Sequence, residues 1–219
     1  MRYKLTFEYD GTQFSGWQKQ PDARTVEGTF EQAFSTLFQQ EIDVVGQGRT
    51  DAVVHASGQT AHADLPNRYP SSRILHAMKG ILPEDVALLK IENVPNDFHP
   101  RFDALSRSYR YQVINRSAPL LRHKAWQRNG KLDEALLQQC AELVIGEHDF
   151  VNFCIPSGGE HQTTICTISQ SCWKKEVDML IYEITGNRFL RHLVLRLVGT
   201  MVKVSAGDRF SFTKLVSDH

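Results

Sequence analysis

Residues 2–12 read RYKLTFEYDGT, and this stretch carries the fold prediction for the first part of the chain. Apolar and polar residues alternate along it, which puts Tyr3, Leu5, Phe7 and Tyr9 on one face of an extended segment. A period of two is typical of a β-strand with one buried face. Asp10-Gly11-Thr12 then supplies turn-forming residues. We therefore expect a strand over residues 2–9 that ends in a turn.

The segments after this strand predict a helix, two strands, a second helix and a further strand. Thr25 is a candidate helix cap, and apolar residues recur after it at helical spacing: Phe30, Ala33, Phe34, Leu37 and Phe38. The later elements are expected at residues 42–46 (strand), 58–65 (strand), 71–82 (helix) and 86–94 (strand). The order β-α-β-β-α-β is the split unit of ferredoxin-like folds.

The second part of the chain predicts the same order up to its last element. Strands are expected at residues 105–115, 163–175 and 178–186, and helices at residues 131–145 and 188–204. Residues 205–219 are too short and polar for a closing strand. We therefore expect an α+β protein of two ferredoxin-like halves, residues 1–97 and 98–219. Their antiparallel sheets should join around a basic cleft, and the second half should lack its usual last strand.

Composition indicates a globular protein without a membrane segment. Hydrophobic residues make up 41% of the 219 residues, which is enough for a core. The chain has neither a run of 18 apolar residues nor an apolar signal peptide, so we expect a cytoplasmic protein. The four cysteines show no CxxC spacing, and His55 and His62 have no cysteine or carboxylate at ligand spacing, so no metal site is expected.

Charge is balanced overall, with 25 basic and 25 acidic residues, but it is unevenly distributed. Residues 101–128 contain one acidic residue, Asp103, and the basic residues Arg101, Arg107, Arg110, Arg116, Arg122, Lys124 and Arg128. Aromatic residues are interleaved with these cations. Such a segment can bind phosphates and stack bases, or it can be the solvated face of a strand. The charge pattern leaves both interpretations open.

Residues 46–56 read GQGRTDAVVHA and present the candidate chemistry in a glycine-rich turn. A cation beside Asp51, such as Arg49, favours the ionised carboxylate. An ionised, partly desolvated carboxylate can act as a base or a nucleophile. An ordinary loop with an Arg–Asp pair has the same residue types, so this pattern alone leaves the role of Asp51 open.

The order of several motifs resembles the tRNA pseudouridine synthase A family, whose active-site signature reads GRTDAGVHA. Residues 48–56 read GRTDAVVHA and differ from it only at Val53. The resemblance runs from residue 3 to about residue 204. Further matches follow in the same order: Tyr9-Asp10-Gly11, Gly16-Trp17-Gln18, Phe98-His99, Arg101-Phe102, Tyr109-Arg110-Tyr111, Gly146-Glu147-His148-Asp149-Phe150, Phe189-Leu190-Arg191-His192 and Gly199-Thr200.

The resemblance implies a reaction and a set of site residues. The family isomerises uridine to pseudouridine at positions 38 to 40 of the tRNA anticodon stem-loop, without metal or cofactor, by breaking the N1–C1′ bond and rejoining the uracil through C5. Asp51 matches the catalytic aspartate, which could attack the base or the sugar or take a proton. Tyr109 matches the tyrosine that lies against the target base, and Arg49 is expected to hold Asp51 or the flipped nucleotide. Arg101 and Arg107 are expected to bind the tRNA partner, and the family implies a homodimer.

One departure from the family pattern concerns the cation beside the catalytic carboxylate. The family helix carries an arginine there, and counting from Phe189 puts Leu195 at that position. On a helix over residues 188–204, Arg191 would lie about 40° from Leu195 and Arg196 about 100° away. Arg191 and Arg49 are therefore the first candidates to supply the missing charge to Asp51.

Two alternatives to an active synthase stay open. Leu195, Val53 and a C-terminal part shorter than in the family could belong to a catalytically weakened member that binds tRNA without turnover. A carboxylate-based hydrolase on a ferredoxin-like scaffold would also use Asp51, but the ordered motifs argue against it.

Overall fold

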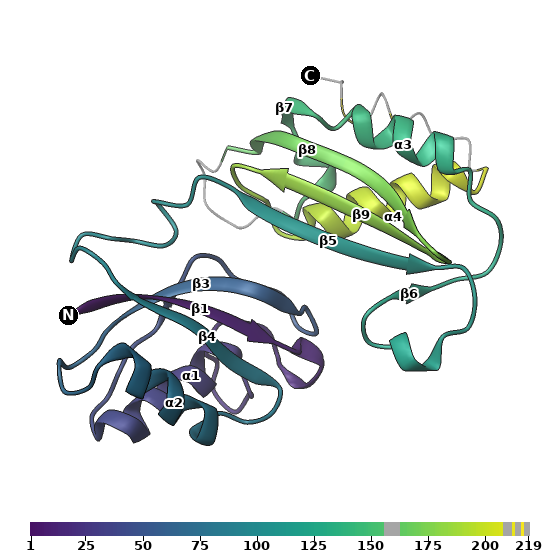
Figure 1. The fold of residues 1–219 in the computed structure, drawn as a ribbon. Helices are drawn as coiled ribbons and strands as arrows, with labels where there is room; N and C mark the ends of the chain where they lie inside the picture. The colour runs from purple at the N-terminus through teal and green to yellow at the C-terminus, as the bar shows by residue number, and fades with distance from the viewer. Residues whose placement is uncertain (156–162, 208–211, 213–215, 217–219) are drawn as a thin grey trace. The chain divides into compact units, whose positions relative to one another are not determined.

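The computed structural model describes residues 1–155 and 163–207 together with Phe212 and Val216. The chain divides into two compact units, Met1–Ala104 and Leu105–His219, whose elements are labelled in Figure 1. Residues 98–104 thus group with the first unit, and the functional domain boundary at residue 97 stays a prediction. No helix in the described part of the chain is long and apolar enough to cross a membrane.

The first unit has the ferredoxin-like arrangement predicted for it. Its elements are β1 (Arg2–Tyr9), α1 (Val26–Phe38), β2 (Val45–Gly46), β3 (Ala56–Asp64), α2 (Ser71–Ile81) and β4 (Val86–Asn93), with a short 3-10 turn at Gly11–Gln13. The sheet order is β2-β3-β1-β4, and all neighbouring strands are antiparallel. The strand expected over residues 42–46 is reduced to two residues.

The alternating face of β1 forms the core of this unit, as its period of two predicts. Leu5 and Phe7 are fully buried beneath α1 and α2, which cover one face of the sheet (Figure 1). The rings of Phe7 and Phe30 stack with their centroids 3.7 Å apart. The predicted helix cap is confirmed, because Oγ1 of Thr25 accepts the N–H of Gly28 at 3.3 Å.

The second unit contains the predicted strands and helices and two strands that were not predicted. Its strands are β5 (Arg107–Ile114), β6 (Trp126–Gln127), β7 (Gly146–Asp149), β8 (Ile165–Glu176) and β9 (Met179–Gly186). Its helices are α3 (Glu134–Glu142) and α4 (Leu193–Ser205), with 3-10 turns at Pro119–Leu121 and Val151–Phe153. The sheet order is β6-β5-β9-β8-β7. Neither β6 nor β7 has a run of alternating residues long enough to be recognised in the sequence.

The outer edge of β5 is where the closing strand of the second half would pair, and its absence stays a prediction because residues 208–211, 213–215 and 217–219 lie outside the described residues. In a ferredoxin-like unit the closing strand pairs antiparallel with the first strand. Here β5 pairs on that side only with β6, in parallel and through Val113 and Ile114 alone. Within residues 163–207, Phe212 and Val216, no strand follows α4. Both halves are therefore α+β units, and their junction around a basic cleft stays a prediction.

The helix expected over residues 188–204 begins five residues later than predicted. His192 has a left-handed backbone (φ 63°), which an α-helix cannot include, and α4 therefore starts at Leu193. Arg188 and Arg191 precede the helix, so the angle of about 40° between Arg191 and Leu195 was wrong. The apolar pattern continues through Phe189 and Leu190 without marking this break.

A segment that follows β4 covers part of the sheet in the first unit. The guanidinium of Arg2 donates to the carbonyl of Phe98 at 3.1 Å and forms two hydrogen bonds with Asp64. The ring of His99 meets that of His62 edge-on, with centroids 5.4 Å apart. His62 is only 6% exposed, and its Nδ1 has no hydrogen-bond partner among the described residues.

Burial lowers the pKa of His62 below its ordinary value of 6.5, and the positive charges of Arg2 and His99 act in the same direction, against Asp64. Between the folded-state pKa of His62 and its ordinary value of 6.5, the unfolded chain binds more protons than the folded chain. The free energy of unfolding is therefore highest above pH 6.5 and decreases as pH falls.

We expect wild-type protein to lose more unfolding free energy than His62→Phe between pH 7.5 and pH 5 in urea titrations. The exposed His76→Gln should follow the wild type, and parallel curves for wild type and His62→Phe would contradict the prediction.

Candidate active site

Asp51 lies on the connection between β2 and β3 and is exposed. The loop around it is fixed by backbone hydrogen bonds to the segment that follows β1. The N–H of Trp17 donates to the carbonyl of Thr50 at 3.0 Å, and the N–H of Val53 donates to that of Phe14 at 3.4 Å. These bonds flank Asp51 on both sides, so its backbone is held although the residue is exposed.

Two glycines allow the loop to approach its support so closely. A Cβ added to Gly11 would lie 2.0 Å from the carbonyl oxygen of Val54, and one added to Gly46 would lie 2.5 Å from the indole of Trp17. Neither distance is compatible with a side chain. The glycines of these motifs are therefore required for the backbone packing beneath Asp51.

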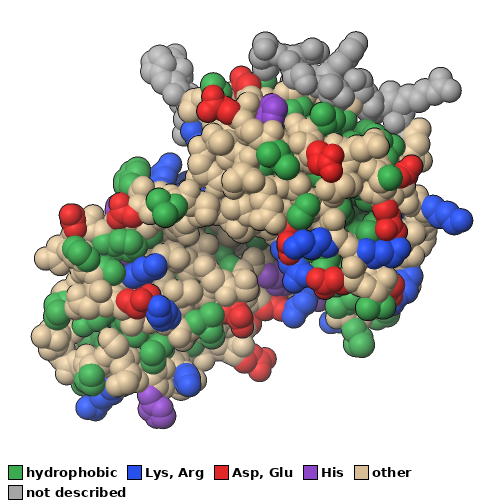
Figure 2. Space-filling view, turned by 45° about the horizontal axis from the view of Figure 1, so that its top comes forward, with side chains coloured by type: hydrophobic (Ala, Val, Ile, Leu, Met, Phe, Trp, Pro, Cys, Tyr) green, Lys and Arg blue, Asp and Glu red, His purple; other side chains and the backbone are tan. Residues whose placement is uncertain are grey.

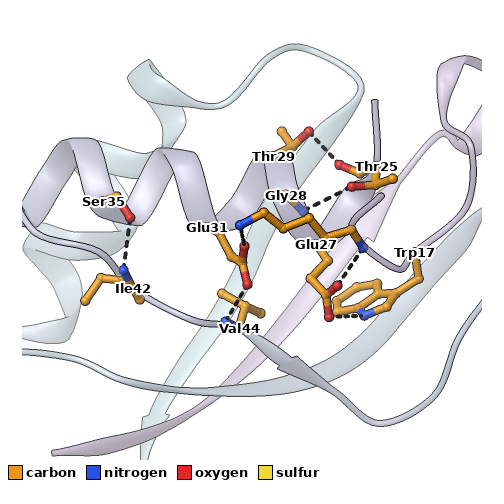
Figure 3. A network of polar contacts seen from close by, with 10 residues as sticks. Trp17, Thr25, Glu27, Gly28, Thr29, Glu31, Ser35, Ile42 and Val44 are labelled. Atoms are coloured by element: carbon orange, nitrogen blue, oxygen red, sulfur yellow. Dashed lines mark hydrogen bonds and ion pairs between the residues drawn. The ribbon is translucent and has the colours of Figure 1, made fainter. Parts of the chain in front are cut away.

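Trp17 is the buried base of this support, with 2% of its surface exposed. Its indole N–H donates to Glu27 at 3.2 Å, and the other carboxylate oxygen of Glu27 accepts the N–H of Lys19 at 2.7 Å (Figure 3). Glu27 lies in the first turn of α1, where a negative charge interacts favourably with the helix dipole. The start of α1 thereby fixes the loop that supports Asp51.

Side chains add two further contacts between the loop and the end of β1. The hydroxyl groups of Tyr9 and Thr50 are hydrogen-bonded at 2.9 Å. Nδ1 of His55 lies 3.2 Å from the N–H of Gly11 and 3.1 Å from a carboxylate oxygen of Asp10. A neutral Nδ1 accepts from Gly11, whereas a protonated one donates to Asp10. Either state ties the loop to residues 10–11.

The segment of residues 10–18 and Arg24 have a structural role in this unit. Phe14 is 3% exposed, and the guanidinium of Arg24 lies 4.1 Å from the centre of its ring. Arg24 also forms a bidentate ion pair with Asp85 at 2.6 and 2.7 Å.

Arg49, two residues before Asp51, is exposed, and its expected contact with Asp51 or the flipped nucleotide stays a prediction. The same exposure leaves the guanidinium of Arg49 accessible to a substrate phosphate or base.

The second unit fixes the other predicted site residues by its own contacts. Tyr109 lies on β5, half-buried, and its ring meets Phe189 edge-on with centroids 4.9 Å apart. Arg107 on the same strand donates to the carbonyl of Asn187 at 2.7 Å. The carbonyl of Arg191, in the turn before α4, accepts the N–H of Ile155 at 3.3 Å.

The basic segment of residues 101–128 is partly neutralised by acids that are distant in sequence. Arg110 forms an ion pair with Glu176 at 2.7 Å, and Arg116 forms one with Asp178. Both acids come from the β8–β9 hairpin. Figure 2 accordingly shows basic and acidic side chains interleaved on the visible surface. Arg110 and Arg116 are thus less available to RNA than the sequence indicates.

Leu195, which the count from Phe189 puts at the position of the family arginine, and its neighbour Arg196 have different surroundings on α4. The side chain of Leu195 is 44% exposed. The guanidinium of Arg196 donates to the carbonyl of Cys154 at 2.7 Å. This bond holds the end of the 3-10 turn at Val151–Phe153, which directly precedes Cys154. Arg196 is therefore a structural residue of the second unit. In the described ranges no three His, Cys, Asp or Glu side chains gather to hold a metal ion.

Val53, two residues after Asp51, has a left-handed backbone (φ 59°) and a side chain that is 62% exposed. This conformation costs a β-branched residue about 1–2 kcal/mol, and its exposed side chain regains little by burial. Asparagine tolerates a left-handed backbone. Unlike glycine, it does not increase the conformational entropy of the unfolded chain. We therefore expect Val53→Asn to raise the free energy of unfolding by about 1 kcal/mol, and Val53→Gly by somewhat less. Urea titrations of the purified variants measure this.

Two other valines serve as controls for the strain at Val53. Val177, at the β8–β9 turn, also has a left-handed backbone (φ 58°) and should gain from asparagine for the same reason. Val45 is partly exposed on β2 and is not among the residues with positive φ, so Val45→Asn should give no gain. A loss of stability in Val53→Asn would show that the side chain makes a compensating contribution.

Comparison with known proteins identifies a family. The family described as tRNA pseudouridine synthase matches residues 5–103 and 140–211. The matched ranges include Asp51, Arg49, Arg101 and Arg191, whereas Arg107 and Tyr109 lie between them.

Similar proteins cover nearly all of the chain. A tRNA pseudouridine synthase A of Xanthobacter autotrophicus is 39% identical over 211 residues, which is 94% of this chain and 85% of the relative. One of Acetivibrio thermocellus is 38% identical over 206 residues (93% and 84%), and one of Bacillus subtilis is 37% identical over 211 residues (94% and 85%). The chain therefore belongs to the tRNA pseudouridine synthase family, a family of isomerases.

Proposed function

We propose that this protein isomerises uridine to pseudouridine in the anticodon stem-loop of tRNA, at the family positions 38 to 40. The observation that carries the proposal is the loop of Asp51, which is exposed yet held by backbone bonds on both sides. A reacting carboxylate must be held in place and still be accessible to the nucleotide, and this loop meets both requirements.

We assign the reaction to the carboxylate of Asp51 and the binding of substrate to arginine and tyrosine side chains. The N1–C1′ bond of uridine breaks, the uracil turns and a C5–C1′ bond forms, while C5 releases its proton and N1 takes one up. An anionic carboxylate can serve this sequence by adding to carbon or by stabilising a cation-like sugar. Tyr109 offers an aromatic face to the flipped base, and Arg49, Arg101, Arg107 and Arg191 offer cations to the RNA. We further propose a cytoplasmic homodimer that uses no cofactor.

A catalytically weakened protein is the second candidate, and Leu195 favours it. An exposed leucine stands where the family pattern has the arginine that pairs with the aspartate. Arg191 precedes α4 and is our candidate for the replacement cation.

The test is tritium release from tRNA transcripts that carry 5-[³H]-uridine. We expect release by the wild type and none by Asp51→Ala. An opposite charge within reach of a carboxylate stabilises its ionised form by about 1.4–4 kcal/mol, so Arg191→Ala should slow release by about 10- to 1000-fold. Transcripts with cytidine at position 38, 39 or 40 should each lose the share of release that belongs to that site.

Controls separate the two candidates. The exposed Lys79→Ala on α2 should release tritium like the wild type. Tight binding of unmodified tRNA by the wild type without any release would support the weakened protein. Unchanged release by Asp51→Ala would contradict the assignment of the catalytic group.

Tyr9 is expected to position the catalytic loop through its hydrogen bond to Thr50. Tyr9→Phe keeps the buried ring, which is 2% exposed, and removes only the hydroxyl. A hydrogen bond of this kind contributes about 0.5–1.5 kcal/mol, so we expect kcat to fall by about 2- to 10-fold with little change in KM. Tyr3→Phe, on the same buried face of β1, should leave kcat unchanged.

A double-mutant cycle identifies the partner of Tyr9. If the contact with Thr50 is responsible, Thr50→Val should lower kcat similarly, and the double variant should lose little more than either single variant. Additive losses would show that Tyr9 and Thr50 act separately.

A further inference from the structure

The turn at residues 99–103 is a rigid structure at the end of the first unit. The carbonyl of His99 accepts the N–H groups of Phe102 at 3.1 Å and Asp103 at 2.9 Å. In return, the carboxylate of Asp103 accepts the N–H of His99 at 2.8 Å. Pro100 occupies the second position of the turn, where its fixed φ is favourable, and is buried.

Contacts with the sheet hold this turn in place. Arg2 donates to the carbonyl of Phe98, and the ring of His99 lies against that of buried His62. Nδ1 of His99 also accepts the N–H of Arg101 at 3.2 Å. The backbone on both sides of Phe102 is therefore fixed before any ligand binds.

Phe102 stands out from this fixed turn with 75% of its surface exposed. Its ring contacts that of His99 at a tilt of 44°, with centroids 4.5 Å apart. The guanidinium carbon of Arg101 lies 5.9 Å from the ring centre. The exposed fraction is too large for both faces of the ring to be covered, so a flat ligand has access to it.

We propose that Phe102 is a stacking platform for an unstacked base of the RNA substrate, with Arg101 contacting an adjacent phosphate. An aromatic face beside a guanidinium matches the chemistry of a nucleotide, which combines a π-face with a negative charge. Asp103 is the nearby acid, and its carboxylate accepts the His99 N–H within the turn. This inference rests on the proposed function, since that function makes tRNA the ligand.

The experiment measures the Kd of an unmodified tRNA transcript for Phe102→Ala, Phe102→Trp and Arg101→Ala over a range of salt concentrations. Loss of one stacked base should raise Kd about 5- to 150-fold in Phe102→Ala and leave the salt slope unchanged. Phe102→Trp should bind at least as tightly as the wild type. Arg101→Ala should lower the slope of log Kd against log salt concentration by about one unit, which corresponds to the loss of one phosphate contact.

Leu105→Ala is the matched control, because Leu105 is a large apolar side chain three positions away and 94% exposed. It should bind tRNA like the wild type. A blunt RNA duplex, whose bases are stacked inside, should bind wild type and Phe102→Ala equally. Wild-type affinity for tRNA in Phe102→Ala, or equal losses in Phe102→Ala and Leu105→Ala, would overturn the proposal. A change of oligomeric state in Phe102→Ala with tRNA affinity retained would assign the residue to a protein contact instead.

Tritium release distinguishes failure of this inference from failure of the proposed function. Phe102→Ala should raise KM for tRNA while kcat at saturating tRNA stays close to wild type. Normal release with unchanged KM and Kd would reject the platform alone. Absence of release from the wild type would reject the proposed function, while the binding measurements would still decide the role of Phe102.

Discussion

The contact between residues 10–18 and residues 46–56 is the constraint on which the site depends. Gly11 and Gly46 leave no room for a Cβ, and the buried indole of Trp17 fills the space below. Because Trp17 is in turn bonded to Glu27 at the start of α1, the loop position follows from the core of the first unit. Asp51 can therefore be exposed without being mobile at its backbone, which a reacting group on an ordinary surface loop cannot achieve.

Much of the fold was predictable because hydrophobic periodicity reports burial directly. β1, α2 and β4 lie within one residue of their predicted bounds, and α1 begins directly after the predicted cap Thr25. The turn of the β8–β9 hairpin lies at Val177, between the strands expected at residues 163–175 and 178–186. The start of α4 was not predictable, since Phe189 and Leu190 extend the apolar pattern past the left-handed His192. Strands as short as β6 and β7 exist only because a neighbouring strand pairs with them, and sequence patterns do not record pairing.

The candidate site was predicted from motifs, but its support and its electrostatics were not. The motif GRTDAVVHA pointed to Asp51, whereas the hydrogen bond between Tyr9 and Thr50 joins residues 41 positions apart. The basic segment looked nearly free of acids because Glu176 and Asp178 reach Arg110 and Arg116 only in the folded sheet. Net charge along a sequence thus overstates the charge that a strand presents to RNA when its neighbours carry the opposite sign.

The strain at Val53 follows from the same constraint that fixes Asp51. A left-handed β-branched residue persists only where its neighbours determine the backbone more strongly than its own preference does. Here the N–H of Val53 is bonded to Phe14, and His55 is tied to residues 10–11. The loop therefore keeps its course even though the residue at position 53 disfavours it. Since the family pattern has glycine there, valine at position 53 adds strain, and the backbone contacts hold the loop of Asp51 despite that strain.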